Sequence, residues 1–371
     1  MKFSQSTCYS VASIFACTCV QAASGLTGLS TPKIDTHSHV YPDWYRQAVI
    51  DAGWVPGPDG NAAPPFWNVS YHLDFMAANN IEKSYVSCSS PGTNLYPNDT
   101  ATNIHITREF NNYTSDLKQK YPNKFGFFAS LPLPDINAAL LEIDRALDEL
   151  DADGFVFLSN HWGLYHGDPK LAPVYKKLND RKAVIFIHPT NPCPKDAPAN
   201  ITGTPRLNYV APLMWAYQAP VLEFFFDAAR TVSDLILTGT VQKYANVRWI
   251  IPHCGGVLPA VFERFLRTSS LLGAKVGTDR PAVPYTLANA TALLQKQFWF
   301  DLAGFSMSSQ IWSMSRLFGP NKFLYGSDFA FTAPVGAIAL TGDMNTTLPQ
   351  IYNQTEIGWI FKENAVGLLG K

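Results

Sequence analysis

Short apolar runs of five to seven residues alternate with longer amphipathic stretches along most of this chain. The runs are apolar at successive positions, as expected for parallel strands that are covered on both faces. The pattern predicts eight strands, at Lys33–His37, Lys83–Cys88, Phe125–Leu131, Gly154–Ser159, Ala183–His188, Val247–His253, Phe298–Leu302 and Lys322–Gly326.

The stretches between these strands have the periodicity of amphipathic helices. The predicted helices are Ala101–Lys120, Ile136–Leu150, Leu222–Tyr244, Gln310–Phe318 and Glu356–Leu369. Strands that alternate with helices indicate an α/β fold with a parallel sheet. The count of eight strands favours a closed (β/α)8 TIM barrel over an open sheet.

Three longer inserts rich in Pro, Gly and Asn interrupt this alternation of strands and helices, at Tyr41–Trp67, Pro189–Pro220 and Leu271–Gln295. Two of them follow the C-terminal ends of strands, where barrel enzymes build their pockets. Nothing else in the sequence indicates a second domain. We therefore expect a single barrel domain with loop insertions over residues 32–371.

Residues 1–22 resemble a secretory signal peptide. Lys2 supplies a positive start, Val11–Val20 is mostly small and apolar, and Val20–Ala22 resembles a cleavage site. The stretch is too short for a membrane span, and a disordered tail or a weak anchor is the alternative interpretation. We expect a protein of the secretory pathway, either secreted, endomembrane or vacuolar.

Seven Asn-x-Ser/Thr acceptor motifs agree with this expectation and predict a glycoprotein. They begin at Asn68, Asn98, Asn112, Asn200, Asn289, Asn345 and Asn353. Without the leader, Cys88, Cys193 and Cys254 remain, an odd number that argues against a disulfide scaffold.

The composition is that of a globular protein with a large core, with 47% hydrophobic and 15% charged residues. The net charge of −1 and the lack of any basic run argue against binding to nucleic acid. Aromatic residues make up 13% of the chain, which suits an aromatic-lined pocket.

Residues that commonly bind metals stand at four predicted strand ends. His37 and His39 end strand one, His188 ends strand five, His253 ends strand six and Asp328 follows strand eight. In a barrel these ends converge on one mouth, and His37 and His39 lie on the same face of their strand. Imidazoles with a carboxylate suit a divalent ion such as zinc and leave room for water or substrate.

Each position also has a structural alternative. His37 and His39 could be ordinary strand histidines, and His188 and His253 could bond to backbone at their strand ends. Asp328 could be a helix N-cap, a common role for Asp at a strand–helix junction. The coincidence at four strand ends favours the metal site.

The motifs resemble those of the amidohydrolase superfamily of the amidohydrolase 2 type. Within it they are similar to the branch named for aminocarboxymuconate semialdehyde decarboxylase, which includes decarboxylases acting on resorcylate, salicylate and 6-methylsalicylate. The resemblance covers about residues 32–370, and its motifs lie at Asp35–His39, Phe127–Asp135, His188–Pro189, Leu237–Thr240, His253–Gly256 and Gly326–Phe329.

The resemblance implies that His37, His39, His188 and Asp328 hold the metal and that His253 is the acid/base residue. It further implies that Arg264, eleven residues beyond His253, binds a substrate carboxylate. In the family this arginine can reach the neighbouring subunit's site, so a homodimer is expected. A surface helix position is the alternative for Arg264.

Two differences from the family pattern restrict the expected number of metal ions and the expected class of substrate. Strand four and the residues after it, Gly154–His161, contain no Lys or Glu that could bridge a second ion, so we expect one divalent metal, zinc with manganese as the alternative. Asn160 and His161 are expected to face the substrate instead. The family's second arginine has no counterpart at its spacing, since only Arg46 lies nearby, which argues against a dicarboxylate substrate.

The predicted function is non-oxidative decarboxylation of an aromatic acid of the hydroxybenzoate type, without an organic cofactor. The metal would bind the carboxylate and a neighbouring hydroxyl, and His253 or Asp328 would deliver the proton. Two alternatives remain open. The same metal could activate water for hydrolysis of a lactone, ester or amide, or the barrel could be a binding protein without catalysis.

Overall fold

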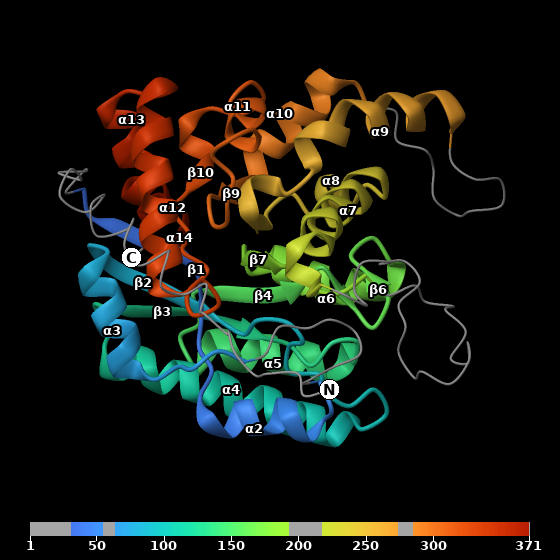
Figure 1. Cartoon of the computed structure of the whole chain (residues 1–371). Helices are drawn as coiled ribbons and strands as arrows, with labels where there is room; N and C mark the ends of the chain where they lie inside the picture. Colours follow the sequence, from blue (N-terminus) through green and yellow to red (C-terminus); the bar gives the residue numbers. More distant parts are fainter. Residues whose placement is uncertain (1–30, 55–63, 193–216, 274–284, 371) are drawn as a thin grey trace, which may run out of the picture.

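The structure is a computed structural model that describes residues 31–54, 64–192, 217–273 and 285–370. Its centre is a barrel of eight parallel strands that follow one another in chain order (Figure 1). These strands are β1 (Lys33–His39), β2 (Ile81–Ser87), β3 (Phe125–Ser130), β4 (Gly154–Leu158), β7 (Val184–His188), β8 (Arg248–Ile251), β9 (Phe298–Asp301) and β10 (Phe323–Leu324).

Backbone contacts between the last strand and the first close the barrel. The N–H of Thr36 donates to the carbonyl of Tyr325 at 3.0 Å, and the N–H of His39 donates to the carbonyl of Phe329 at 2.6 Å. Ser38 and Phe329 form a parallel bridge just beyond β10. The segment that carries Asp328 is therefore joined to the strand that carries His37 and His39.

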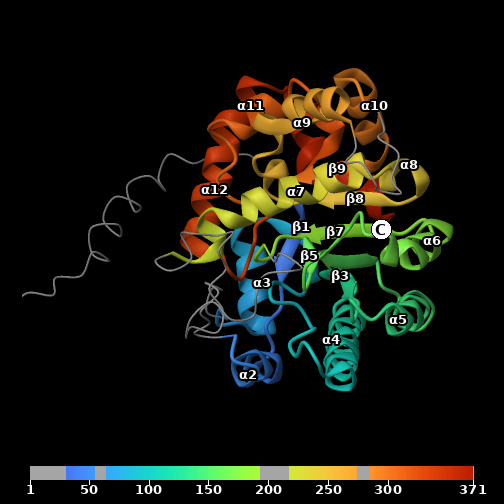
Figure 2. The same ribbon diagram turned by 90° about the vertical axis from the view of Figure 1, so that its right-hand side faces the viewer.

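Helices surround the strands on all sides. In both views α2, α4 and α5 lie below the strands, whereas α9, α10 and α11 lie above them (Figures 1 and 2). The helices are α2 (Asp43–Asp51), α3 (Val69–Ala78), α4 (Thr100–Lys120), α5 (Ile136–Asp148), α6 (Ala172–Asp180), α7 (Glu223–Leu237), α8 (Thr240–Lys243), α9 (Leu258–Leu272), α10 (Leu287–Gln297), α11 (Gln310–Met314), α12 (Pro334–Thr347), α13 (Gln354–Gly358) and α14 (Asn364–Leu369).

The prediction of a (β/α)8 barrel is confirmed, and each of the eight predicted strands overlaps an observed one. The prediction of one continuous helix over Leu222–Tyr244 is wrong. It is divided into α7 and α8 at Gly239, whose φ of 73° lies in the left-handed region that ends α-helices. A short antiparallel hairpin of β5 (Asn160–His161) and β6 (Leu164–Tyr165), which the sequence did not predict, follows β4.

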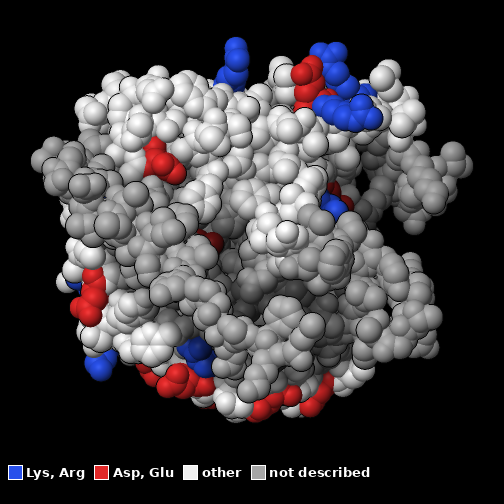
Figure 3. All heavy atoms as spheres, viewed as in Figure 1, with Lys and Arg blue, Asp and Glu red and all other residues white. Residues whose placement is uncertain are grey.

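Buried strand residues and the inner faces of the helices form one large hydrophobic cluster. Among the described residues, no helix has both the length and the apolar character needed to cross a membrane. On the face drawn in Figure 3, charged side chains lie mainly near the margins, and uncharged atoms make up most of the described surface. The predicted signal peptide, residues 1–22, lies outside the described residues, as does most of the insert after β7.

Candidate active site

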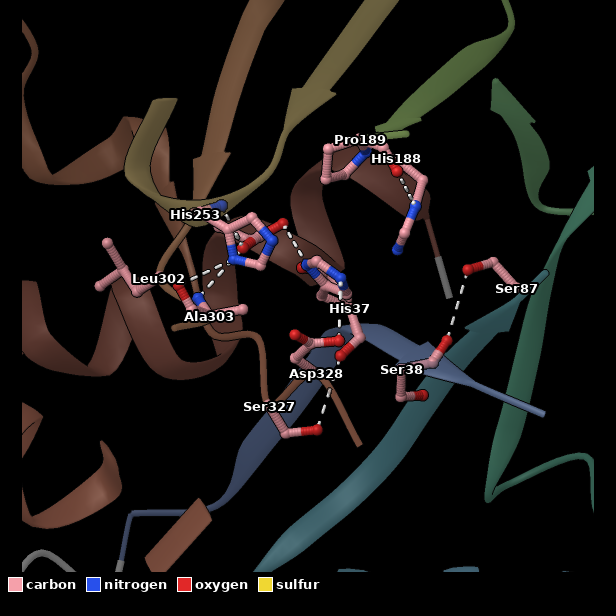
Figure 4. A network of polar contacts seen from close by, with 12 residues as sticks. His37, Ser38, Ser87, His188, Pro189, His253, Leu302, Ala303, Ser327 and Asp328 are labelled. Atoms are coloured by element: carbon pink, nitrogen blue, oxygen red, sulfur yellow. Dashed lines mark hydrogen bonds and ion pairs between the residues drawn. The ribbon is translucent and has the colours of Figure 1, made fainter. Parts of the chain in front are cut away.

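Three histidines bring their imidazoles together at the C-terminal end of the barrel. His37 and His39 come from the end of β1 and His188 from the end of β7. One ring nitrogen of each lies within 4.8 Å of the others, and all three side chains are buried. Figure 4 shows His37 and His188 with His253 and Asp328 around a common space. The strand ends thus converge as the sequence predicted.

Each of these rings is anchored through Nδ1. His37 Nδ1 lies 3.0 Å from Asp301 Oδ2, His39 Nδ1 lies 3.3 Å from Ser87 Oγ, and His188 Nδ1 lies 2.7 Å from the Pro189 carbonyl. An acceptor at Nδ1 fixes the proton there and leaves Nε2 for a metal. The arrangement is that of preoriented metal ligands.

The carboxylate of Asp328 completes the cluster. Its Oδ1 lies 3.2 Å from His39 Nε2 and 3.6 Å from His37 Nε2. Nε2 of His37 and of His39 are buried and have no hydrogen-bond partner of good geometry. Because such orphaned buried nitrogens are costly, this donor set fits a divalent cation.

Without a metal, the titratable groups of the cluster differ in the direction in which their pKa values are shifted. Burial lowers the pKa values of His39, His188 and His253. Burial also acts against protonation of His37, but the Asp301 and Asp328 carboxylates outweigh it and raise its pKa to about 9. Burial acts to raise the pKa of Asp328, yet the neighbouring imidazoles hold it below its usual range. A cation would therefore displace a proton from His37.

His253 follows β8 and is held on three sides. Its Nδ1 lies 3.3 Å from the Ala303 carbonyl, its backbone N–H donates to Asp301 Oδ1 at 3.0 Å, and its ring stacks on Phe225 with centroids 5.3 Å apart. A Cβ at Gly304 would lie 3.1 Å from His253 Nδ1. The ring of His253 therefore has a fixed position beside the cluster.

Asp301 at the end of β9 is a site residue that sequence reasoning missed. One of its oxygens accepts from His37, and the other accepts the backbone N–H groups of His253 and Ala303, each at 3.0 Å. The signal that could have found it was an aspartate ending the apolar run Phe298–Asp301, a strand-end position like those of the predicted metal-binding residues.

Asp35 is a second buried carboxylate that was not predicted to have a role. It accepts the N–H of His37 at 3.1 Å, and it accepts the N–H and the hydroxyl of Ser327 at 3.0 and 2.6 Å. These bonds tie β1 to the residue that precedes Asp328. Burial raises the pKa of Asp35 to about 7, with the bonds from Ser327 and His37 acting in the opposite direction.

Three of the described non-glycine residues with a strained backbone lie at this site. His253, Cys254 and Asp328 have φ values of 53°, 52° and 57°, in the left-handed region that non-glycine residues seldom adopt. Such residues persist where the surrounding structure over-determines them, and they cluster at functional sites.

A cavity of about 180 Å³ opens beside His188, His253 and Asp328. None of the described residues that line it is Lys or Arg. Its other lining residues are Ser89, Ser90, Pro220, Phe224, Phe225, Gly304, Phe305, Phe331, Thr332 and Leu340. The cavity is thus lined mostly by aromatic and aliphatic side chains, with the hydroxyl groups of Ser89, Ser90 and Thr332 among them.

The structure places the three remaining predicted residues away from this cavity. Asn160 bonds to Asp227, to the Asn191 carbonyl and to the Gly163 N–H. His161 lines a separate cavity of about 20 Å³. Arg264 is exposed on α9. Contact of these residues with a substrate stays a prediction.

The family model for amidohydrolases matches residues 34–371. Decarboxylase macB of Penicillium terrestre is 33% identical over 316 residues, which cover 82% of this chain and 86% of that protein. The 6-methylsalicylic acid decarboxylase acuB of Aspergillus aculeatus is 32% identical over 312 residues, with 82% and 86% covered.

Solved structures agree with the fold. A crystal structure of amidohydrolase II has a TM-score of 0.75 and 31% identity, and the match covers 91% of this chain and 100% of that one. A dihydroxybenzoic acid decarboxylase from Polaromonas sp. JS666, solved with manganese and the inhibitor 2-nitroresorcinol, has a TM-score of 0.72 and 20% identity, with 92% and 97% covered. The chain belongs to the amidohydrolase family.

Proposed function

We propose that this protein is a metal-dependent carboxy-lyase that decarboxylates an aromatic acid of the 6-methylsalicylate type without an organic cofactor. The observation that carries the proposal is the cluster of the buried His37, His39 and His188 with the partly buried Asp328, beside an aromatic-lined cavity. Relatives support the proposal, because decarboxylases are about one third identical in sequence to this protein over 82% of the chain.

His37, His39, His188 and Asp328 would hold one divalent cation. A cation there supplies Lewis acidity and a template for the substrate's carboxylate and neighbouring hydroxyl. We propose zinc as the ion. Manganese is the alternative, and it is the ion found in the Polaromonas structure. The chain's own contribution is to hold a proton at Nδ1 of each ring with a fixed acceptor, so that the three Nε2 atoms face one space and offer lone pairs once His37 has released its second proton.

The reaction replaces the carbon–carboxylate bond with a carbon–hydrogen bond, so a proton must reach the ring carbon. His253 is placed to relay it: the Ala303 carbonyl holds a proton at Nδ1, so Nε2 would first take up a proton from solvent and then pass it to the ring carbon. Asp328 is the second candidate, and because the neighbouring imidazoles hold its pKa below the usual range, it too would take up a proton before delivering it. General acid catalysis of this kind contributes roughly 10² to 10⁴ in rate.

The size and lining of the cavity restrict the substrate. A dry cavity of about 150 Å³ accommodates benzene in a protein core, so about 180 Å³ accommodates one substituted benzene ring. The aromatic lining favours an apolar substituent. A second carboxylate would find no cationic side chain among the described lining residues, which disfavours dicarboxylic acids.

Two further proposals concern the state of the protein. We propose a homodimer in which Arg264, exposed on α9 and without an ion pair among the described residues, serves the partner's site. We also propose that residues 1–22 direct the chain into the secretory pathway, with glycosylation at exposed acceptors such as Asn98 and Asn353. Neither proposal is needed for the chemistry.

The test incubates purified, metal-loaded protein with hydroxybenzoic acids and with aromatic lactones, while carbon dioxide and ring products are measured. Decarboxylation releases one carbon dioxide per ring product from an ortho-hydroxy acid and leaves lactones intact. Opening of a lactone without carbon dioxide release would instead support the hydrolase alternative.

A further inference from the structure

The hydroxyl of Ser89 lies against the nitrogen that His188 would offer to a metal. Ser89 Oγ is 3.3 Å from His188 Nε2, and Ser89 is buried in the wall of the larger cavity. His188 Nδ1 bonds to the Pro189 carbonyl, so Nδ1 carries the proton and Nε2 presents a lone pair. Ser89 therefore donates its hydroxyl proton to Nε2.

A metal ion at the cluster competes with Ser89 for this lone pair. Once Nε2 of His188 is engaged, the Ser89 hydroxyl loses the only side-chain partner that the described residues give it. A buried hydroxyl without a partner is unfavourable, so it will turn to another acceptor in the cavity. Loading the site with metal thus frees a donor beside it.

The other hydroxyls of the cavity are placed differently. Ser90 Oγ is bonded to Thr190 Oγ1 at 2.7 Å, a pair that does not involve the histidine cluster. Thr332 is only partly buried, in the segment between β10 and α12. Among the described lining residues, Ser89 is therefore the hydroxyl that metal loading releases next to the ligands.

We infer that Ser89 is a substrate-binding residue, whose hydroxyl donates a hydrogen bond to one of the two substrate oxygens at the metal. These are an oxygen of the carboxylate and the oxygen of the ortho hydroxyl. The inference rests on the proposed function for the identity of the substrate. It makes Ser89 a specificity residue for acids that bind through oxygens on adjacent positions.

Ser89→Ala and the matched control Ser115→Ala test this inference in the full-length protein loaded with Mn²⁺. Ser115 is buried on α4, outside the cavity lining, and its hydroxyl donates to the Leu150 carbonyl at 3.0 Å. Calorimetry measures the affinity for two probes: benzoate, which has the carboxylate alone, and 2-nitrophenol, which has the hydroxyl beside a nitro group. A hydrogen bond to a charged oxygen predicts about tenfold or greater weakening of at least one probe by Ser89→Ala. Ser115→Ala should change both affinities by less than about threefold, since its hydroxyl bonds to Leu150.

Metal content and metal affinity provide the second readout. Ser89→Ala should retain metal affinity at or above that of the wild type, because it removes a competitor for His188 Nε2. Wild-type affinity of Ser89→Ala for both probes would overturn the inference, and so would loss of metal from this variant. If the wild type binds the probes but releases carbon dioxide from no hydroxybenzoate, the proposed function fails while the Ser89 contact stands.

Discussion

His37 and Asp301 form a fully buried pair, with His37 Nδ1 3.0 Å from Asp301 Oδ2 and neither side chain exposed to solvent. Through its other oxygen, Asp301 also accepts the backbone N–H of His253. One aspartate at the end of β9 thus orients both a proposed metal ligand and the proposed proton donor. Carboxylates that hold a ligating imidazole in this way fix its tautomer and increase its basicity.

Asp301→Asn should weaken metal binding by about 10- to 100-fold. The amide would donate to His37 Nδ1 and force the ring proton onto Nε2, which faces the metal. Competition with a chromogenic chelator measures the dissociation constant. Asp153→Asn is the matched control, since Asp153 is a buried carboxylate that bonds to Lys118 and to the Phe127 N–H, just before β4. It should lower stability without changing metal affinity, and equal effects of both variants would contradict the role of Asp301.

His253→Ala should retain the metal and lose about 10²- to 10⁴-fold in turnover, because it removes the proton donor without removing a ligand. His188→Ala should lose metal and activity together, because a ligand is missing. Metal analysis and carbon dioxide release on the same samples measure both. Loss of metal from His253→Ala, or full metal occupancy of His188→Ala, would show that these two roles have been assigned wrongly.

The buried His166 should make the free energy of unfolding fall at acidic pH. It is buried with its two ring nitrogens 2.6 Å from the Tyr175 hydroxyl and 2.7 Å from the Leu158 carbonyl. Burial lowers its pKa from 6.5 to about 4, with the Leu158 bond acting in the opposite direction. Below pH 6.5, His166 is protonated in the unfolded chain but stays neutral in the folded protein. The free energy of unfolding therefore falls as the pH decreases toward 4.

His166→Gln should make the free energy of unfolding less dependent on pH. Between pH 6.5 and 4 its slope should decrease by the equivalent of one proton, which is about 1.4 kcal/mol per pH unit. Urea unfolding of the metal-free protein at several pH values gives the slope. The difference between variant and wild type at pH 8 reports the loss of packing and hydrogen bonds alone. An unchanged slope would mean that His166 is protonated in the folded protein.

The small cavity beside His161 should hold one ordered water molecule. Its volume of about 20 Å³ is enough for one. Asn94 Oδ1 and His161 Nε2 are buried without a hydrogen-bond partner, and Ser130 Oγ has only the weak acceptor Cys88 beside it. A high-resolution crystal structure should show density bonded to these atoms. An empty cavity would contradict the prediction, and an aromatic acid bound at His161 would instead support its predicted contact with substrate.

The sequence predicted the barrel because its strands are apolar on both faces and its helices are amphipathic, and both signals are local. It also predicted that His37, His39, His188 and Asp328 meet at one end of the barrel, because the ends of parallel strands converge there. The break at Gly239 was missed because the apolar periodicity continues across it. Asp301 also ends an apolar run, but its role depends on its bond to His37, 264 positions away, and the contact of Ser89 is with His188, 99 positions away; these roles do not follow from a local pattern.

Titration of the metal-free protein with Mn²⁺ or Zn²⁺, with carbon dioxide release from a salicylate-type acid followed at each step, tests the central claim most directly. A single site of three histidines and one carboxylate predicts that activity rises with added metal and reaches its plateau at about one ion per chain. Full activity in the absence of metal, or one bound ion per chain without any decarboxylation, would contradict it.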